Sequence, residues 1–181
     1  MKPYNILLRT ATPADTHLLQ YWDSQPHTVA SDPNGFSNWE EDLAYKPAWR
    51  EQLIAELNGR PIGFIQIIDP ALEETHYWGD APENLRAIDI WIGEAADLGK
   101  GYGTVMMKLA LERCFQPEAV TAVVIDPLAT NTKAIRFYER LGFRFVEYRQ
   151  FDEDYCAVYE LLRVDWEILK MPNDINTGKS R

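Results

Sequence analysis

The segment AIDIWIGEAADLGKGYGTVMMKLALERCF, residues 87–115, decides the fold of this chain. Its first seven residues are apolar apart from Asp89 and predict a buried strand. Three glycines then fall within residues 99–103 and predict a tight turn. From Tyr102 onward, apolar side chains recur at i, i+3, i+4, i+7 and i+8, which is the spacing of one helix face.

The glycine-rich turn has two interpretations. The first N–H groups of a helix have no internal partner, so a turn that opens a helix can bind an anion. It can equally be a tight connection that binds nothing. Lys100 is followed by Gly101 rather than by Ser or Thr, which excludes a P-loop, and the glycine spacing does not fit the dinucleotide fingerprint.

A second block, DPLATNTKAIRFYERLGF at residues 126–143, follows an apolar strand at 120–125. With this block the chain resembles the GNAT superfamily of acetyl-CoA-dependent N-acetyltransferases. The family loop Q/R-x-x-G-x-G/A is matched by LGKGYG at 98–103, except that Leu98 replaces Gln or Arg, a position whose main chain contacts the pyrophosphate in the family. The second family pattern, N-x-x-A-x-x-x-Y-x-x-x-G-F, is matched by Asn131, Ala134, Tyr138, Gly142 and Phe143.

Within the superfamily the chain looks most like the aminoglycoside 6'-N-acetyltransferases. This narrower likeness rests on Ile88-Asp89, on residues 98–101, on Asp126-Pro127 and on the sequence NGRPIG at 58–63. Acyltransferases of siderophore biosynthesis share parts of the same motifs, so a hydroxylamine acceptor stays open.

The resemblance implies an α/β fold: a mixed, mostly antiparallel sheet, flanked by helices and splayed at its two central parallel strands. Alternation and apolar runs predict strands at 4–9, 49–57, 61–68, 87–93, 120–125, 143–151 and 156–163. Helices are expected at 12–22, 39–45, 102–115, 131–141 and 165–170, and loops at 25–38 and 69–85. Residues 1–170 are expected to form one acetyltransferase domain, followed by a flexible tail at 171–181.

The net charge of −10 argues against a nucleic-acid partner and favours a small cationic one. Six acids and one base lie between Asp69 and Asp89, although a solvated loop also explains such a run. The two cysteines have no metal-binding spacing, and no apolar run reaches membrane length, so we expect no metal, no membrane and a cytoplasmic protein. A monomer and a homodimer both stay open.

Asp89 is the one acid of an apolar strand. A carboxylate beside a bound ammonium group can accept its proton, directly or through water. The resemblance implies the same role, and the alternative is a structural carboxylate. Tyr138 lies on the apolar face of its helix, where the family has a tyrosine that protonates the departing thiolate; the alternative is a core tyrosine.

The resemblance also implies which residues bind acetyl-CoA, the expected co-substrate. Backbone N–H groups of the central strand are expected at the thioester and the glycine-rich loop at the pyrophosphate, and Lys100 either adds charge there or faces solvent. The expected cofactor-binding residues are Ile90, Trp91, Ile92, Leu98, Gly99, Lys100, Gly101, Tyr102, Gly103, Thr104, Asn131, Ala134 and Tyr138.

Acidic and aromatic side chains are the candidates for the acceptor site. An acidic site with aromatic walls suits a multiply charged amino sugar. Asp126 either binds a second amine or only opens a turn with Pro127. The expected acceptor-binding residues are Trp22, Glu74, Tyr77, Trp78, Asp80, Asp89 and Asp126.

The sequence therefore predicts direct transfer of acetyl from acetyl-CoA to a primary amine in a ternary complex, with an aminoglycoside 6'-amine as the leading acceptor. The rivals are the same fold acting on a siderophore hydroxylamine, a polyamine or a protein amine, and a non-catalytic module that binds acetyl-CoA.

Overall fold

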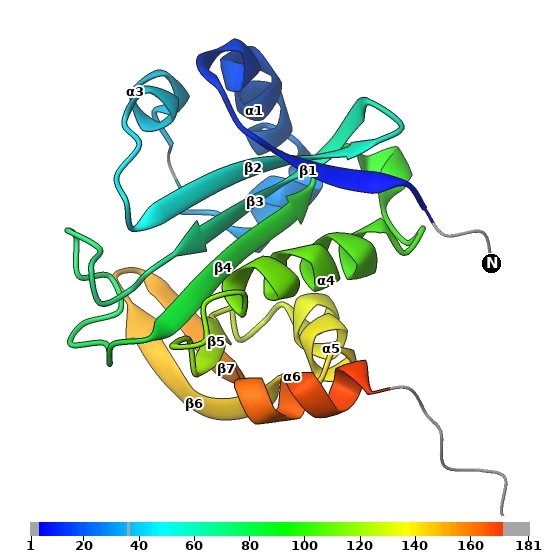
Figure 1. Cartoon of the computed structure of the whole chain (residues 1–181). Coiled ribbons are helices and arrows are strands. Elements are labelled where there is room, and N and C mark those ends of the chain that lie inside the picture. Colours follow the sequence, from blue (N-terminus) through cyan, green and yellow to red (C-terminus); the bar gives the residue numbers. More distant parts are fainter. Residues whose placement is uncertain (1–3, 36, 172–181) are drawn as a thin grey trace, which may run out of the picture.

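The computed structural model describes residues 4–35 and 37–171. The described residues form thirteen helices and strands besides two short 3-10 turns (Figure 1). In chain order these are β1 (Ile6–Thr10), α1 (Thr16–Asp23), α2 (Pro26–Ser31), α3 (Trp39–Ala44), β2 (Arg50–Leu57), β3 (Arg60–Ile68), β4 (Leu85–Ile92), α4 (Tyr102–Cys114), β5 (Ala122–Ile125), α5 (Thr132–Arg140), β6 (Arg144–Phe151), β7 (Asp154–Leu162) and α6 (Arg163–Lys170).

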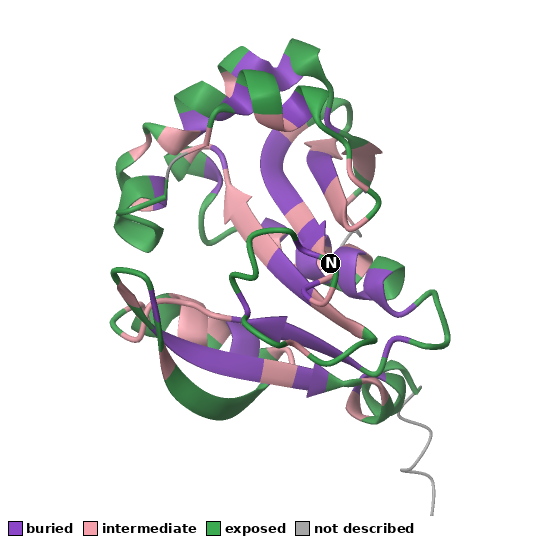
Figure 2. Cartoon of the chain, turned by 90° about the vertical axis from the view of Figure 1, so that its left-hand side faces the viewer, coloured by how far each residue is buried: buried purple, intermediate pink, exposed green. Residues whose placement is uncertain are grey.

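All seven strands join one sheet in the order β1-β2-β3-β4-β5-β7-β6. Every neighbouring pair is antiparallel except β4 and β5, which are parallel. This parallel pair is short: β4 pairs with β5 only from Leu85 to Ala87, whereas it pairs with β3 up to Ile92. The two strands then diverge, as Figure 2 shows. The predicted mixed sheet, splayed at its central parallel strands, is confirmed.

The two faces of the sheet carry different helices. On one face, α4 and α5 cover a large apolar cluster that includes Leu53, Ile65, Met106 and Leu111. On the other face, α1 and α3 cover a second cluster in which the rings of Trp22, Trp39 and Phe64 pack together. Because side chains alternate along a strand, neighbouring residues of β4 point to opposite faces of the sheet.

The hairpin between β2 and β3 is tighter than the sequence suggested. Its turn is the two residues Asn58 and Gly59, both with positive φ (52° and 81°), which matches the twist of the flanking strands. The expectation that Arg60 and Pro61 lengthen the turn is wrong, because both residues already pair with β2. A register shift between Ala55 and Glu56 accommodates this end of the hairpin.

The predicted loop at 25–38 contains a helix, so that prediction is wrong in part. Helix α2 begins at Pro26, whose fixed φ suits a first helical turn, and ends at Ser31. The expected tail is described only at Met171; residues 172–181 lie outside the described part of the chain. Among the residues that the structure describes, no helix is long and apolar enough to span a membrane.

Candidate active site

The divergence of β4 and β5 leaves one backbone edge of β4 open. The N–H of Gly93 donates to Ile62 on β3, so the backbone groups of odd-numbered residues face β3. Those of Ile90 and Ile92, beyond the last residue of β4 that pairs with β5, therefore face the opening. The carbonyl of Ile92 accepts a hydrogen bond from Nε2 of His27, at 2.8 Å. This contact was not predictable from the sequence, because His27 belongs to the unexpected helix α2.

The glycine-rich loop has the backbone that the sequence predicted. Gly99 and Gly101 adopt left-handed φ values of 73° and 84°, which glycine reaches without strain. Gly101 is the N-cap of the 13-residue helix α4, so the first N–H groups of that helix are free to bind an anion. An extended open edge that leads to a helix N-terminus suits a chain that ends in phosphates, such as the pantetheine arm of coenzyme A.

A buried carboxylate fixes the start of this loop. Asp97 is 4% exposed and accepts hydrogen bonds from Arg60 at 2.7 and 3.2 Å and from Lys100 at 3.1 Å. The bonds from Arg60, assisted by the one from Lys100, hold the pKa of Asp97 below its usual range. Lys100 is thus an ion-pair partner of Asp97.

Asp89 lies in the part of β4 that faces the opening. Its Oδ2 accepts a hydrogen bond from Nε2 of Gln66 on β3, at 3.0 Å. Burial and the charge of Asp126 raise the pKa of Asp89 to about 7, although the bond from Gln66 acts in the opposite direction. A carboxylate with such a pKa exchanges protons near neutral pH, as a general base must.

Asp126 follows the last residue of β5 and faces the same opening. Tyr77 donates its hydroxyl hydrogen to Oδ2 of Asp126, at 2.6 Å. Burial raises the pKa of Asp126, whereas the bond from Tyr77 lowers it. The ring of Tyr77 stacks on Phe151 at 4.6 Å between centroids. The structure therefore brings together Asp89, Asp126 and Tyr77 from three separate segments of the chain.

Two further acids belong to this group and were not singled out from the sequence. The charges of Asp32 and Glu73 both raise the pKa of Asp89, and that of Asp32 also raises the pKa of Asp126. Glu73 is 8% exposed, and its Oε2 has no partner among the described residues. Asp32 follows helix α2, so only the fold reveals that it lies near β4.

Tyr138 is buried on helix α5, with its ring against Phe137 and Phe143. Burial raises the pKa of Tyr138, and the charges of Asp89 and Asp126 raise it further. The hydroxyl therefore stays protonated at neutral pH. Asn131 caps the same helix, because its Oδ1 accepts the N–H of Ala134 at 3.1 Å.

The remaining acceptor candidates lie in different places. Trp22 is 1% exposed, and Gly93 packs so closely on its ring that a Cβ there would approach within 2.0 Å. The expectation that Trp22 lines the acceptor site is therefore wrong. Trp78 is buried beneath Tyr77 and supports it edge-on. Glu74 is exposed and accepts a hydrogen bond from Tyr45 at 2.6 Å, and Asp80 is exposed.

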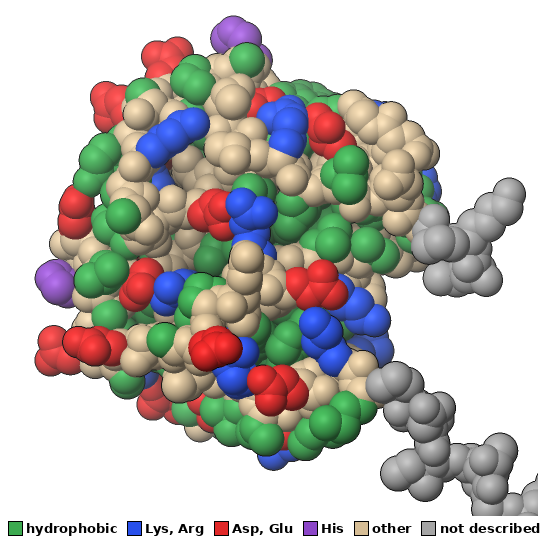
Figure 3. All heavy atoms as spheres, viewed as in Figure 1, with side chains coloured by type: hydrophobic (Ala, Val, Ile, Leu, Met, Phe, Trp, Pro, Cys, Tyr) green, Lys and Arg blue, Asp and Glu red, His purple; other side chains and the backbone are tan. Residues whose placement is uncertain are grey.

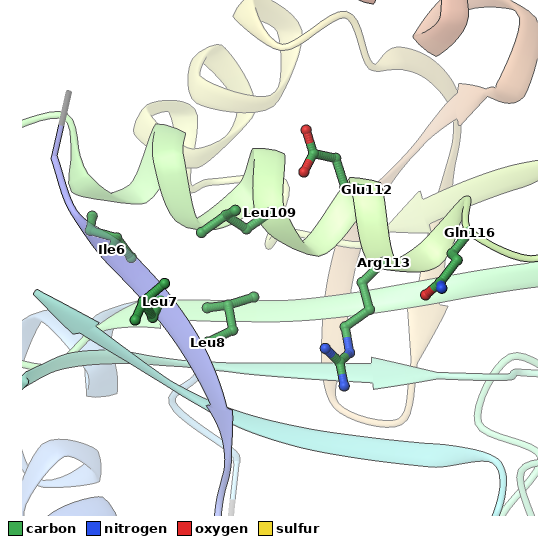
Figure 4. A pocket seen from close by; sticks show the side chains of 7 residues that line it. All are labelled: Ile6, Leu7, Leu8, Leu109, Glu112, Arg113 and Gln116. Carbon is green, nitrogen blue, oxygen red and sulfur yellow. The ribbon is translucent and has the colours of Figure 1, made fainter.

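The structure also has two hollows of similar size. One, of about 410 Å³, lies beside Tyr77 and Trp78 and extends to Arg149 and Asp152. The other, of about 400 Å³, lies between β1 and α4 (Figure 4), and none of the predicted site residues line it. The hollow beside Tyr77 and Trp78 adjoins the candidate site, and the hollow between β1 and α4 does not.

Acidic and basic side chains are interspersed over the face of the molecule seen in Figure 3.

Comparison with known proteins agrees with this geometry. A model of the acetyltransferase (GNAT) domain matches residues 11–151. An aminoglycoside N(6')-acetyltransferase type 1 from Klebsiella pneumoniae is 32% identical over 150 residues, which cover 77% of this chain and 74% of the relative. A kanamycin resistance protein from Rhizobium radiobacter is 37% identical over 73 residues, or 40% of this chain and 68% of the relative.

Solved structures show the same fold. The crystal structure of aminoglycoside acetyltransferase AAC(6')-Ib in complex with coenzyme A and kanamycin superposes with a TM-score of 0.83 at 27% identity, covering 92% of this chain and all of the other. An aminoglycoside N(6')-acetyltransferase from Legionella pneumophila, at 21% identity and a TM-score of 0.72, shares the fold over 94% of this chain and 99% of its own. The chain therefore belongs to the GNAT family of acetyl-CoA-dependent N-acetyltransferases.

Proposed function

We propose that this enzyme transfers the acetyl group of acetyl-CoA to the 6'-amine of an aminoglycoside. The observation that carries the proposal is the pair of carboxylates, Asp89 and Asp126, at the open end of the central parallel strands, where burial and their mutual repulsion hold the pKa of Asp89 at about 7. Relatives named as aminoglycoside N(6')-acetyltransferases, and a related structure that holds coenzyme A and kanamycin, support this choice of acceptor.

Acetyl-CoA supplies the acetyl group as a thioester. Its pantetheine arm fits the open edge of β4 from Ile90 to Ile92, since a strand edge offers N–H and C=O groups in the register that the arm's amides require. Its pyrophosphate fits the loop from Leu98 to Gly103, where the N-terminus of α4 favours negative charge.

Asp89 is the general base of the proposed reaction. The acceptor amine arrives largely as an ammonium ion, which has no lone pair with which to attack. Asp89 accepts one proton, directly or through a water molecule, and leaves a neutral amine next to the thioester carbonyl. Asp126 binds a second ammonium group of the same acceptor, and Tyr77 fixes the orientation of the Asp126 carboxylate.

Tyr138 is the general acid. Attack of the amine forms the new C–N bond, and collapse of the adduct breaks the C–S bond and releases the thiolate of coenzyme A. Because its pKa is raised, Tyr138 is protonated at neutral pH and can give its proton to that thiolate. The second proton of the attacking amine leaves to solvent, Asp89 then loses its proton and Tyr138 regains one, so the products are the amide, the free thiol and one proton.

Release of coenzyme A in the presence of different amines tests the proposal. The panel is kanamycin, spermidine and lysine hydroxylated on its side-chain nitrogen (hydroxylysine below), which represent the amino-sugar, polyamine and siderophore alternatives. We expect saturable turnover with kanamycin, reduced at least 100-fold in Asp89→Asn and at least 10-fold in Tyr138→Phe.

Calorimetry with acetyl-CoA provides the control, because both variants should still bind it. Turnover with spermidine or hydroxylysine alone would overturn the choice of acceptor. Binding of acetyl-CoA without turnover of any amine would favour the non-catalytic alternative, and near-normal turnover of both variants would refute the two catalytic assignments.

A further inference from the structure

Three polar side chains form a hydrogen-bonded row across the centre of the sheet. Gln52 on β2 is opposite Gln66 on β3, which in turn is opposite Asp89 on β4. Nε2 of Gln52 donates to Oε1 of Gln66 at 3.1 Å, and Nε2 of Gln66 donates to Oδ2 of Asp89 at 3.0 Å. On the same face, the neighbouring paired positions of β2 and β3 are the apolar residues Ile54 and Phe64.

The row has one direction. If the amide of Gln66 were reversed, its carbonyl oxygen would face the carboxylate of Asp89 and its NH₂ group would face the NH₂ group of Gln52. Both contacts would be repulsive, so the NH₂ group of Gln52 and the carboxylate of Asp89 together favour the orientation in which Gln66 donates to Asp89. Gln52 is 8% exposed, and an amide so buried keeps its partner because the loss of a buried hydrogen bond is costly.

The row engages only one oxygen of Asp89. Oδ2 accepts the bond from Gln66, whereas Oδ1 accepts none from any residue that the structure describes. A hydrogen bond to a charged carboxylate also favours its ionised form and therefore lowers its pKa. In this way the row leaves one oxygen of Asp89 free and opposes the groups that raise its pKa.

We propose that Gln66, oriented by Gln52, is a positioning residue that holds Oδ2 of Asp89 and so turns Oδ1 toward the acceptor amine. The inference rests on the proposed function, in which Asp89 is the base. Neither glutamine contacts the reacting atoms in this account, since both act through Asp89.

The other titratable groups around Asp89 act in the opposite direction or respond to it. Asp126 at the end of β5, Asp32 after α2 and Glu73 before β4 all raise the pKa of Asp89 through their negative charge. Tyr77 and Tyr138 have their own pKa values raised by Asp89. Gln66 lowers the pKa of Asp89 and so opposes these charges and burial.

An NMR titration of the Asp89 side-chain carboxyl, labelled with ¹³C, tests the inference without any acceptor or acetyl-CoA. Gln66→Met keeps a similar side-chain length but removes the donor, and we expect it to raise the pKa of Asp89 by roughly one unit. Gln52→Met removes only the group that orients Gln66, so it should raise the pKa by less. Gln20→Met, on the exposed surface of α1, is the matched control and should change nothing.

The pH profile of kcat/KM gives the second readout. In Gln66→Met its acidic limb should move to higher pH by the same amount as the NMR titration, with the KM for acetyl-CoA unchanged. If the pKa of Asp89 is the same in the wild type and in both variants, the proposal is wrong. If the pKa rises as expected but no aminoglycoside is acetylated, the positioning role stands and the proposed acceptor is wrong.

Discussion

Tyr77 and Asp126 are joined by a hydrogen bond of 2.6 Å, which attaches the long loop between β3 and β4 to the end of β5. The bond satisfies one oxygen of Asp126 and leaves its negative charge in place, where it raises the pKa of the neighbouring Asp89. The two strands that diverge at the centre of the sheet thus each carry one carboxylate of a coupled pair.

Replacing Asp126 by Asn should lower the pKa of Asp89, because a like charge is removed from its surroundings. The acidic limb of the kcat/KM profile should therefore move to lower pH, by roughly half a unit to one unit. The KM for a polyamine sugar should rise, since one of its ammonium groups loses its partner. A limb that moves to higher pH, or an unchanged KM, would contradict the role given to Asp126.

Ionisation of Asp89 should lower the free energy of unfolding at high pH. Its pKa is about 7 in the folded protein and about 3.8 in a model peptide, so folding is penalised as pH rises from about 4 to 7. Asp89→Asn removes this penalty, which is worth about 1.4 kcal/mol for each unit of pKa shift. Urea unfolding at pH 8 should show the variant more stable, and at pH 4 the difference should vanish.

The bridge from Arg60 to Asp97 ties the glycine-rich loop, the proposed pyrophosphate site, to the β2–β3 hairpin. Arg60→Met keeps the aliphatic stem and removes the bridge, and we expect a several-fold higher KM for acetyl-CoA. The KM for acetylpantetheine, which has no pyrophosphate, should not change. Arg144→Met is the matched control, because that exposed arginine pairs with Asp165 in another part of the fold. Equal effects on both acetyl donors would argue for a general structural role.

Gly93 should tolerate no side chain. A Cβ at this position would lie 2.0 Å from the ring of Trp22, which is buried in the core. Gly93→Ala should therefore cost about 1–3 kcal/mol of unfolding free energy, measured in urea. Because Gly93 follows the open edge of β4, the KM for acetyl-CoA should rise as well. Gly59→Ala in the exposed hairpin turn, which meets no neighbour, is the comparison for backbone strain alone.

The sequence predicted the parts of this structure that depend on local chemistry. The glycines at 99 and 101 permit the left-handed backbone that the turn adopts, and the apolar spacing after Tyr102 fits a helix, so the loop and α4 were predictable from the sequence. The sequence predicts a loop where α2 lies, because the polar residues of that segment are typical of loops. In the structure a helix begins at Pro26 despite these residues, since the fixed φ of proline suits a first helical turn.

The candidate site was predictable only where a motif carries it. Asp89, Asp126 and Tyr138 belong to motif blocks, whereas Asp32 and His27 reach the site through the packing of distant segments. Gln66 did give a signal, as the only polar side chain in the apolar run from Ile62 to Ile68. Its partnership with Asp89 depends on strand register, which no single strand reveals.

The most direct test of the account compares neomycin with paromomycin, which differ only in an amine or a hydroxyl at the 6' position. The account predicts saturable release of coenzyme A with neomycin, a product acetylated at the 6'-nitrogen, and no release with paromomycin. Equal turnover of the two, or an acetyl group at another nitrogen of neomycin, would contradict the central claim that this enzyme acetylates the 6'-amine.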